Sequence, residues 1–526
     1  MTKKISLILT LSVLFLSFTF GQNFDLTTKL SKKQMYKDFD TFVQIMDSST
    51  HCFVRKIATG YDPVIAIKMK REEIKKIKSY GEFIQFLYYC LPSTMTTHVR
   101  MIGDYKGFYG IKYIDTQAVK PLMNAYIAYL NTLPNSVVGL GNGFYYQGGY
   151  YIYGTQRFIN ITTSDTVIIS NYRVLKHNDE PINIFNKLQL MVGNASVRRW
   201  DYSLQQYYMV YGPYIPRTDR MTVEDYPSKK IVDIDMENYR RQIYTSSLPL
   251  SMWDTLPLEQ SETMKVKYYD SLHLLYIYMG AMIYDEGVFA HSIKEAGKGK
   301  QIDKIIWDIR GNYGGDDFAW MSVLSAIIKN PLPRTASIGF RNTECMKKIF
   351  EDYIEQNSTP PKKISKQIIS FLDSTEFLTV RFGGITEEGD TAYIMSDSNS
   401  LQYDGTIYVL QDEYTISSAG VLIAYCRDYS QLISVGIPTG LIAGKGITPA
   451  IFQLPESKFT FIMEPEVDLT NTKTAFDVFH DRPEIEIYPT FEELIEKNDY
   501  GVFFNQRGDE FLFKHDYLFK KVLKME

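Results

Sequence analysis

The second half of the chain alternates between two kinds of apolar segment, and this alternation limits the fold more than any other feature. From about Lys265 onward, short runs rich in Ile, Val and Leu are followed by segments with apolar residues every three or four positions. The first kind is typical of buried strands and the second of helices that cover a sheet. We therefore predict an α/β fold, with an antiparallel hairpin added from about residue 450. The segments read LHLLYIYMG, GVFAHSIKEAG, KIIWDIR, DDFAWMSVLSAIIKN, GTIYVLQDE, SAGVLIAYCRDY, QLISVGI and AIFQLPESKFTFIMEP.

Two segments of different texture precede this α/β part. Residues 31–89 repeat a helical pattern, and one face of its first helix collects Met35, Phe39, Phe42, Ile45 and Met46. Residues 139–240 contain short β-rich runs separated by Gly, Asn and Asp turn signals. A chain of 526 residues has room for about three domains. We expect an N-terminal helical domain at 22–138, a β-rich domain at 139–245 and the α/β domain at 246–526.

The first 21 residues have the pattern of a secretory signal peptide. Two lysines precede an apolar run at 5–20, and Thr19 and Gly21 supply the small residues of a cleavage site. The run is shorter than the roughly 20 residues that a spanning helix needs, and no later stretch is apolar enough to span. We expect cleavage near Gly21, a secreted or periplasmic protein, and no stable membrane insertion.

Charge and composition exclude some functions and leave others open. A net charge of −4 gives no indication of a nucleic-acid partner. The 40 Tyr and 31 Phe suit strands and peptide-binding grooves, and would equally serve a glycan-binding protein. The four cysteines lack metal-ligand spacing and are either buried free thiols or include one Cys52–Cys90 bridge. They are Cys52, Cys90, Cys345 and Cys426.

Two stretches carry residues with chemical potential. TISSAG, at 415–420, places two serines before an apolar helix, where a serine either caps the helix or acts as a nucleophile. KIIWDIRGNYGGDDFAW ends a buried strand in a glycine-bearing turn. Glycines there allow backbone N–H groups to converge on an oxyanion, although a plain tight turn has the same pattern.

Together, these stretches resemble peptidase family S41, the tail-specific and C-terminal-processing proteases and their tricorn-like secreted bacterial relatives. The family combines D-[LI]-R-x-N-x-G-G at the end of a strand with a later T-x-S-[AS] and V-G-x-x-T. This chain has DIRGNYGG at 308–315, TISS at 415–418 and VGIPT at 435–439. The resemblance implies a crotonase-like (ClpP-like) β/α catalytic core and a serine endopeptidase that cleaves protein or peptide substrates. It implies no metal or organic cofactor.

Register within the resemblance distinguishes the two serines. The family's nucleophile stands two residues after the threonine and about nineteen before the glycine of VG. Ser417 fits both distances, because Gly436 follows nineteen positions later. The resemblance therefore implies that Ser417 is the nucleophile, with an oxyanion hole made by the N–H of Ser418 and that of Gly314 or Gly315.

A serine nucleophile needs a base, and the family offers two solutions. Some members use a lysine from a T-F-G-K-G turn, and TGLIAGKG offers Lys445 three residues beyond that place. Tricorn-like members use a histidine after D-G, and MTTHVRMIG offers His98, which we prefer as the base. His51 falls at the family's N-terminal Hp position. Asp477, six residues before Pro483, occupies the slot of the orienting acid, unless it is a solvated hairpin aspartate.

The chain also departs from the family pattern. Gly420 stands where many relatives carry Glu, and Thr96-Thr97 replaces the D-G before the histidine. These departures motivate a second hypothesis, a catalytically weak or inactive S41-like protein that binds peptides or other ligands. In the β-rich segment, NYRVLKHNDEPINIFNKL resembles part of a PDZ module, which would bind a substrate C-terminus by strand addition. The alternative is a β domain that only shapes the cleft.

Overall fold

A computed structural model describes residues 24–525 of the chain with several gaps. Residues 1–23, which contain the expected signal peptide, lie outside the described part. Within the described part, no helix is long and apolar enough to cross a membrane. The gaps are 95, 97, 133–136, 140–142, 147–148, 182–196, 202–205, 210–213, 217–219, 244–262, 357–376, 384–391, 413, 440–448, 480 and 502–507.

A six-stranded sheet forms the centre of the C-terminal half. Its order is β13-β14-β15-β19-β20-β24, and all neighbours are parallel except β13 and β14. The predicted alternation of strands and helices is thereby confirmed. The strands are β13 (Met264–Tyr269), β14 (Leu274–Met279), β15 (Lys304–Asp308), β19 (Ile407–Gln411), β20 (Leu432–Gly436) and β24 (Ile485–Glu486).

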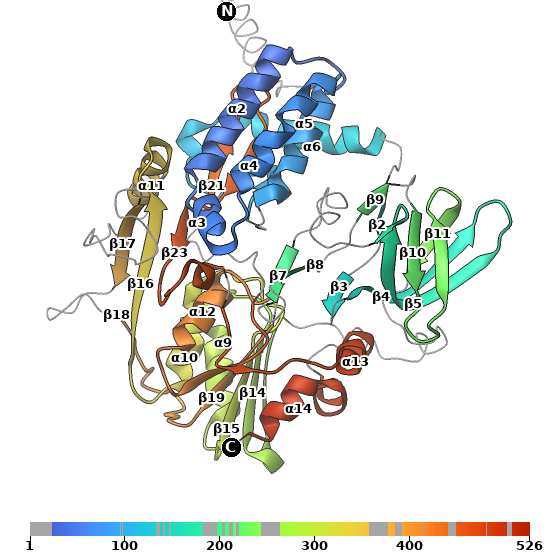
Figure 1. Cartoon of the computed structure of the whole chain (residues 1–526). Helices are drawn as coiled ribbons and strands as arrows, with labels where there is room; N and C mark the ends of the chain where they lie inside the picture. Colours follow the sequence, from blue (N-terminus) through green and yellow to red (C-terminus); the bar gives the residue numbers. More distant parts are fainter. Residues whose placement is uncertain are drawn as a thin grey trace, which may run out of the picture.

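Helices cover both faces of this sheet (Figure 1). Residues that alternate along the strands point to opposite faces, so each strand contributes to two cores. Ile305 and Trp307 pack with α9 (Val288–Gly297), α10 (Asp317–Ile327) and α12 (Ser418–Cys426). Ile306 packs on the other face with the π-helical turn η6 (Phe511–His515) and α14 (Tyr517–Leu523). This double cover explains why the strands read as continuous apolar runs.

The N-terminal segment is helical, as its periodicity predicts. Ser31 caps the first helix with a capping box, and Met35, Phe39, Phe42 and Met46 are buried on one face. Its elements are α2 (Lys32–Ser48), α3 (Thr50–Thr59), α4 (Pro63–Lys68), η1 (Met69–Lys76), α5 (Tyr80–Cys90), η2 (Leu91–Thr94), η3 (Ile111–Tyr113) and α6 (Thr116–Thr132).

A hairpin from the C-terminal half completes the core of these helices. Strands β21 (Ala450–Gln453) and β22 (Thr460–Met463) pair antiparallel, as predicted from the sequence. The short strand β1 (Arg100–Met101) of the N-terminal segment then pairs with β22. Phe461 of β22 is fully buried against the helices, with its ring centroid 5.3 Å from that of Phe42. The hairpin therefore joins the N-terminal segment to the C-terminal half, because its strand β22 pairs with β1.

A second sheet occupies the middle of the chain. It has the order β11-β10-β5-β4-β12, with β3 on β4 and β6 on β5, and all its pairs are antiparallel. The helical part of the PDZ-like segment lies outside the described residues. The strands are β3 (Gly143–Tyr146), β4 (Gly149–Asn160), β5 (Thr166–His177), β6 (Glu180–Pro181), β10 (Arg220–Glu224), β11 (Ile231–Asp235) and β12 (Tyr239–Ile243).

Smaller elements surround these bodies. Phe491, at the start of α13 (Phe491–Gly501), packs its ring 4.1 Å from that of Tyr226 and so contacts the middle sheet. Strand β23 (Glu466–Asp468) follows the hairpin and pairs with β16 (Leu332–Arg341). The remaining elements are β2 (Val137–Gly139), β7 (Val197–Asp201), β8 (Gln206–Met209), β9 (Tyr214–Pro216), η4 (Asp270–Leu272), α11 (Glu344–Gln356), β17 (Phe377–Gly383), β18 (Ala392–Ile394) and η5 (Ala475–Val478).

The four cysteines are free thiols, so the Cys52–Cys90 bridge considered above is not formed. Both of these side chains are buried, each on a helix of the N-terminal segment. Burial raises the pKa of the Cys52 thiol to about 12, and that of Cys90 likewise. They behave as small apolar core residues.

Truncating the ring at the centre of the hairpin core is expected to destabilise the protein. Phe461→Ala should lower the free energy of unfolding by about 3–5 kcal/mol, because it removes a fully buried ring and leaves a cavity. Phe318→Ala is the matched control, since that ring is 62% exposed and its loss should change stability by less than about 0.5 kcal/mol. Thermal unfolding of both variants checks this. Equal midpoints would contradict the packing described here.

Candidate active site

Three loops meet at the carboxyl ends of the parallel strands. Asn312, fully buried in the β15–α10 turn, donates from Nδ2 to the Met279 carbonyl at the end of β14, at 2.7 Å. Its own carbonyl accepts from the N–H of Ile416 at 3.0 Å. Its Oδ1 accepts from the N–H of Gly314 at 2.8 Å. One asparagine therefore fixes the glycine turn against the loop that carries the two serines.

Ser417 has a strained backbone at the start of α12. Its φ of 56° and ψ of −127° lie in a region that residues with a Cβ rarely occupy. Such a conformation costs on the order of 1–3 kcal/mol and persists where the surroundings enforce it, often at functional sites. Ser417 is the N-cap residue, yet its side chain makes no capping hydrogen bond. Its hydroxyl is therefore held at a sharp strand-to-helix turn without serving the helix.

Ser418 has a different role. Its side chain is buried, and the hydroxyl donates to Oδ1 of Asp317 at 2.6 Å. Oδ1 also accepts from the indole N–H of Trp320 at 3.1 Å, and Oδ2 pairs with Arg334 at 2.5 Å. The Ser418 hydroxyl is thus committed to a carboxylate, and its contribution at the site is its backbone N–H.

The glycine turn approaches the serine loop so closely that no side chain fits. A Cβ on Gly314 would lie 2.5 Å from the Ser417 Cβ, and one on Gly315 would lie 2.2 Å from the Met282 carbonyl oxygen. Both glycines also have positive φ, 89° and 141°. The Gly314 N–H donates to Asn312, whereas the backbone bridge between Met282 and Gly315 uses no N–H of Gly315. The Gly315 N–H is therefore the better candidate for an oxyanion donor.

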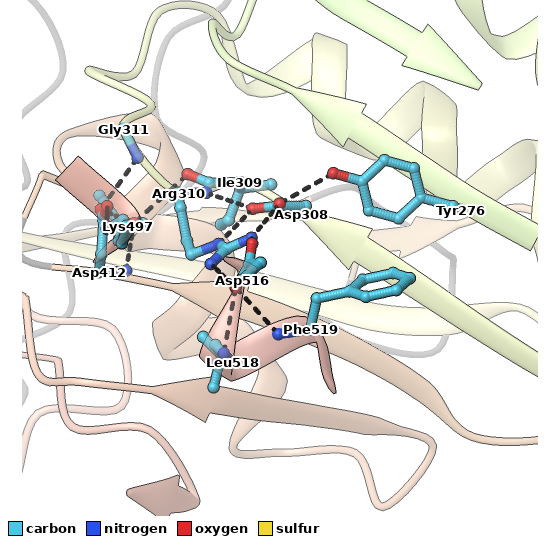
Figure 2. Close-up of polar contacts among 11 residues, drawn as sticks. Tyr276, Asp308, Ile309, Arg310, Gly311, Asp412, Lys497, Asp516, Leu518 and Phe519 are labelled. Atoms are coloured by element: carbon cyan, nitrogen blue, oxygen red, sulfur yellow. Dashed lines mark hydrogen bonds and ion pairs between the residues drawn. The ribbon is translucent and has the colours of Figure 1, made fainter. Parts of the chain in front are cut away.

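A buried ion cluster holds the residues that lead into this turn (Figure 2). Arg310, 2% exposed, donates to both oxygens of Asp308 at 2.9 and 2.6 Å, and to both oxygens of Asp516 at 2.9 and 2.5 Å. The Tyr276 hydroxyl donates to Asp308 at 2.9 Å. Asp516 also caps α14 by accepting from the N–H of Leu518. The DIR residues of the sequence motif therefore join the end of β15 to the C-terminal helix.

His98 lies in the turn before β1 and contacts a buried carboxylate. Its Nδ1 is 2.5 Å from Oε1 of Glu464, the residue directly after β22. The His98 side chain is 21% exposed and that of Glu464 is 3% exposed. Burial opposes the charged form of His98, but the Glu464 carboxylate outweighs it and raises the His98 pKa. The pairing of β1 with β22 creates this contact between residues 366 positions apart in the sequence.

The pKa of Glu464 changes in the opposite direction. Burial alone would raise it, but His98 and His51 together lower it to about 2. His51 Nδ1 lies 3.4 Å from Oε2, the second oxygen of the carboxylate. The acid is therefore ionised at neutral pH and faces two imidazoles.

A short segment after η5 connects the His98–Glu464 pair to the carboxyl end of β19 in the main sheet. Gln411, at the end of β19, donates to the Asp481 carbonyl at 2.9 Å. Two residues earlier, the Phe479 ring lies 4.7 Å from that of His51. The chain from Gln411 through this segment to His51 and Glu464 therefore links the two halves of the site. Among the described residues, no hydrogen bond joins the Ser417 hydroxyl to His98.

Asp477 does not lie at His98, which corrects the expected acid. Its carboxylate accepts from the backbone N–H groups of Lys473 and Thr474, at 2.8 and 2.7 Å, in a capping box at η5. The carboxylate beside His98 is Glu464 instead. Its sequence signal is an acid that ends the apolar run TFIM and precedes a proline. Of the other candidates, Lys445 lies outside the described residues, and Gly420 is buried within α12.

Comparisons with known proteins agree with this geometry. Residues 273–464 match the family model described as peptidase family S41. No curated protein matches the chain in sequence. The crystal structure of mature CPAF is 11% identical, covers 90% of this chain and 98% of its own, and gives a TM-score of 0.50. At that identity the likeness concerns the fold alone.

Two further solved structures are more distant. The photosystem II D1 C-terminal processing protease is 11% identical, with 90% of this chain and 98% of its own covered, at a TM-score of 0.34. The tricorn protease is 12% identical, with 90% and 37% covered, at a TM-score of 0.32. The family match rests on the segment that contains the glycine turn, both serines and Glu464. Over residues 273–464, this chain therefore matches peptidase family S41, a family of serine-type peptidases.

Proposed function

We propose that the protein is a serine endopeptidase in which Ser417 is the nucleophile, His98 the base and Glu464 the acid. The observation that carries the proposal is the strained backbone of Ser417 beside the glycine turn. That backbone directs one hydroxyl away from the helix it caps, as at the strand-to-helix turn of other serine hydrolases. The substrate is a protein or peptide, and its scissile carbonyl would lie between Ser417 and the turn.

The roles follow from which atoms are already engaged. His98 directs Nδ1 at Glu464, so Nε2 remains to take the proton from the Ser417 hydroxyl as Oγ bonds to the carbonyl carbon. The carboxylate stabilises the imidazolium that forms, without taking the proton itself. The developing oxyanion would accept from the N–H groups of Ser418 and Gly315. His98 then protonates the leaving amine, and water hydrolyses the acyl-enzyme.

Activity is expected to appear as His98 loses its proton. Because Glu464 raises the His98 pKa, the acid limb of kcat/KM should lie above the pH at which an isolated imidazole titrates. The pH dependence of kcat/KM gives the pKa of His98 in the free enzyme, because this parameter describes enzyme that has not yet bound substrate.

We also propose that the protein is exported. The support is the N-terminal sequence alone, with its two lysines, apolar run and small residues near Gly21. Export predicts that protein recovered from the periplasm or the medium begins near Gln22. An intact N-terminus on cytoplasmic protein would contradict it.

A second candidate function is peptide or ligand binding with little catalysis. The lack of a hydrogen bond between Ser417 and His98 among the described residues favours it, as does Gly420 in place of the usual Glu. Catalytic hydrogen bonds often tighten only when substrate binds, so the peptidase function requires this bond in the substrate complex and not in the free protein.

Labelling by a fluorophosphonate separates these functions. We expect the wild-type protein to be labelled, because the probe reacts with an activated serine hydroxyl. Ser417→Ala should abolish labelling, whereas Ser418→Ala should retain it, since the Ser418 hydroxyl is bonded to Asp317. Intact-mass spectrometry gives the readout. An unlabelled wild type would favour the binding function, and labelling of Ser417→Ala would exclude Ser417 as the nucleophile.

Removing the charge of Glu464 should impair catalysis without changing the shape of the site. Glu464→Gln is expected to reduce kcat/KM by about 10²–10⁴-fold, because the base loses its orientation and its counter-charge. The acid limb should also move to lower pH, since burial then dominates the His98 pKa. Asp477→Asn is the matched control and should stay within about twofold of wild type.

The base is tested in the same assay. His98→Ala should remove most activity, whereas Lys445→Ala should leave it largely intact. Loss of activity in Lys445→Ala with retention in His98→Ala would transfer the role of base to the lysine. Full activity of Glu464→Gln with loss in Asp477→Asn would restore Asp477 as the acid.

A further inference from the structure

A second imidazole lies behind the catalytic acid, on helix α3. His51 is 1% exposed, and its Nδ1 is 3.4 Å from Oε2 of Glu464. Arg55, one helical turn later and fully buried, places Nη2 3.1 Å from Nε2 of the same ring. The Arg55 guanidinium also stacks on Phe479, with Cζ 4.0 Å from the ring centroid. The order of groups is thus Arg55, His51, Glu464 and His98.

The contact with Arg55 determines the tautomer of His51. A guanidinium only donates hydrogen bonds, so Nε2 of His51 must carry its lone pair toward Arg55. The single proton of the neutral ring is then on Nδ1, which faces Glu464. Burial first, and the Arg55 charge as well, lower the His51 pKa to about 4 although Glu464 opposes them. His51 is therefore neutral at the pH where a peptidase works, with its one N–H directed at Glu464.

The start of α3 is fastened beside the acid. The Thr50 hydroxyl donates to the carbonyl of Pro465 at 2.6 Å, and it accepts from the N–H of Arg341 at 2.8 Å. Pro465 directly follows Glu464 and Thr50 directly precedes His51, so this bond holds His51 beside the Glu464 carboxylate. Positions 51 and 55 are four apart and share one face of the helix.

We infer that His51 is a positioning residue for catalysis, which holds the second oxygen of Glu464 while Arg55 fixes its tautomer. The inference rests on the proposed function. His51 touches neither the substrate nor the reacting atoms. It acts on the carboxylate through Oε2, which lies 3.4 Å from its Nδ1, while Oε1 faces His98. Partners of this kind typically change affinity or activity by about 10–100-fold in metal sites.

The pH readout depends on a small number of charges. The groups that act on His51 are Glu464, Arg55 and His98, and those that act on His98 are Glu464 and Arg100. If His51 holds Glu464 against His98, its removal lets the carboxylate turn away. Burial then dominates at His98, and the His98 pKa falls. A merely structural His51 would affect the yield or the unfolding midpoint of the protein and leave the His98 pKa unchanged.

Two substitutions at position 51 distinguish the loss of the N–H that faces Glu464 from any change of side chain at this position. His51→Ala removes the donor. His51→Gln replaces it with an amide whose NH2 can donate to Glu464 and whose oxygen can accept from Arg55. His273→Ala serves as control, because it removes another histidine–carboxylate pair, to Asp303 at 2.9 Å, at an exposed position. Arg55→Gln tests the tautomer, since a glutamine presents either a donor or an acceptor to Nε2.

The test is a pH titration of the full chain, labelled with ¹⁵N-histidine, by NMR. We expect the wild-type His51 to show an unprotonated Nε2, and Arg55→Gln to show mixed tautomers. The His98 pKa should fall in His51→Ala and stay near the wild-type value in His51→Gln and His273→Ala. A His98 pKa unchanged in His51→Ala, or a wild-type His51 protonated on Nε2, would overturn the inference. If His51→Ala does not fold, the tautomers of wild type and Arg55→Gln decide.

Fluorophosphonate labelling distinguishes failure of the inference from failure of the proposed function. We expect the labelling rate to drop at least tenfold in His51→Ala and less than threefold in His51→Gln, with the acid limb moved to lower pH only in the first. Equal rates and pH profiles for wild type and His51→Ala would overturn the inference and leave the peptidase proposal standing. An unlabelled wild type would remove the proposed function, while the titration would still decide whether His51 positions Glu464.

Discussion

The Arg310 guanidinium, held between Asp308 and Asp516, is the interaction on which the rest of the site depends. Removing one partner of a fully buried ion cluster typically costs about 3–5 kcal/mol, because a charge is left without compensation. Here the cluster fixes the end of β15, where the glycine turn begins, and the cap of α14, which covers one face of the sheet. Figure 2 shows that the single Arg310 side chain contacts both Asp308 at the end of β15 and Asp516 at the cap of α14, so the two are held by the same group.

The site is assembled from parts that are distant in sequence. The glycine turn and the serine loop belong to the α/β sheet, whereas His98 and His51 come from the N-terminal helical segment. The hairpin β21–β22 connects the two, because it completes the helical core and ends at Glu464. The position of Glu464 therefore depends on how the hairpin packs. A loss of core packing at Phe461 would also displace Glu464 from His98.

Local patterns predicted the fold well, and they predicted the site only in part. The buried runs and their helices gave the sheet, and register selected Ser417, whose strained backbone agrees with that selection. The carboxylate beside His98 was misplaced because its identity depends on the pairing of β1 with β22, which no local spacing encodes. Asp477 had a suitable position in the sequence but serves a capping box. His51 matched a family position, yet its link to Glu464 spans 413 residues and becomes evident only in the fold.

The proposed function requires Ser417, His98 and Glu464 to act as one catalytic unit against the glycine turn. The most direct measurement is a crystal structure of the protein inactivated by a peptidyl phosphonate. We expect a covalent bond to Ser417 Oγ, a phosphonyl oxygen that accepts from the N–H groups of Ser418 and Gly315, and His98 Nε2 within hydrogen-bond distance of Ser417 Oγ. An adduct on another residue, or a His98 that points away from Ser417 while a different base approaches Ser417, would refute these roles.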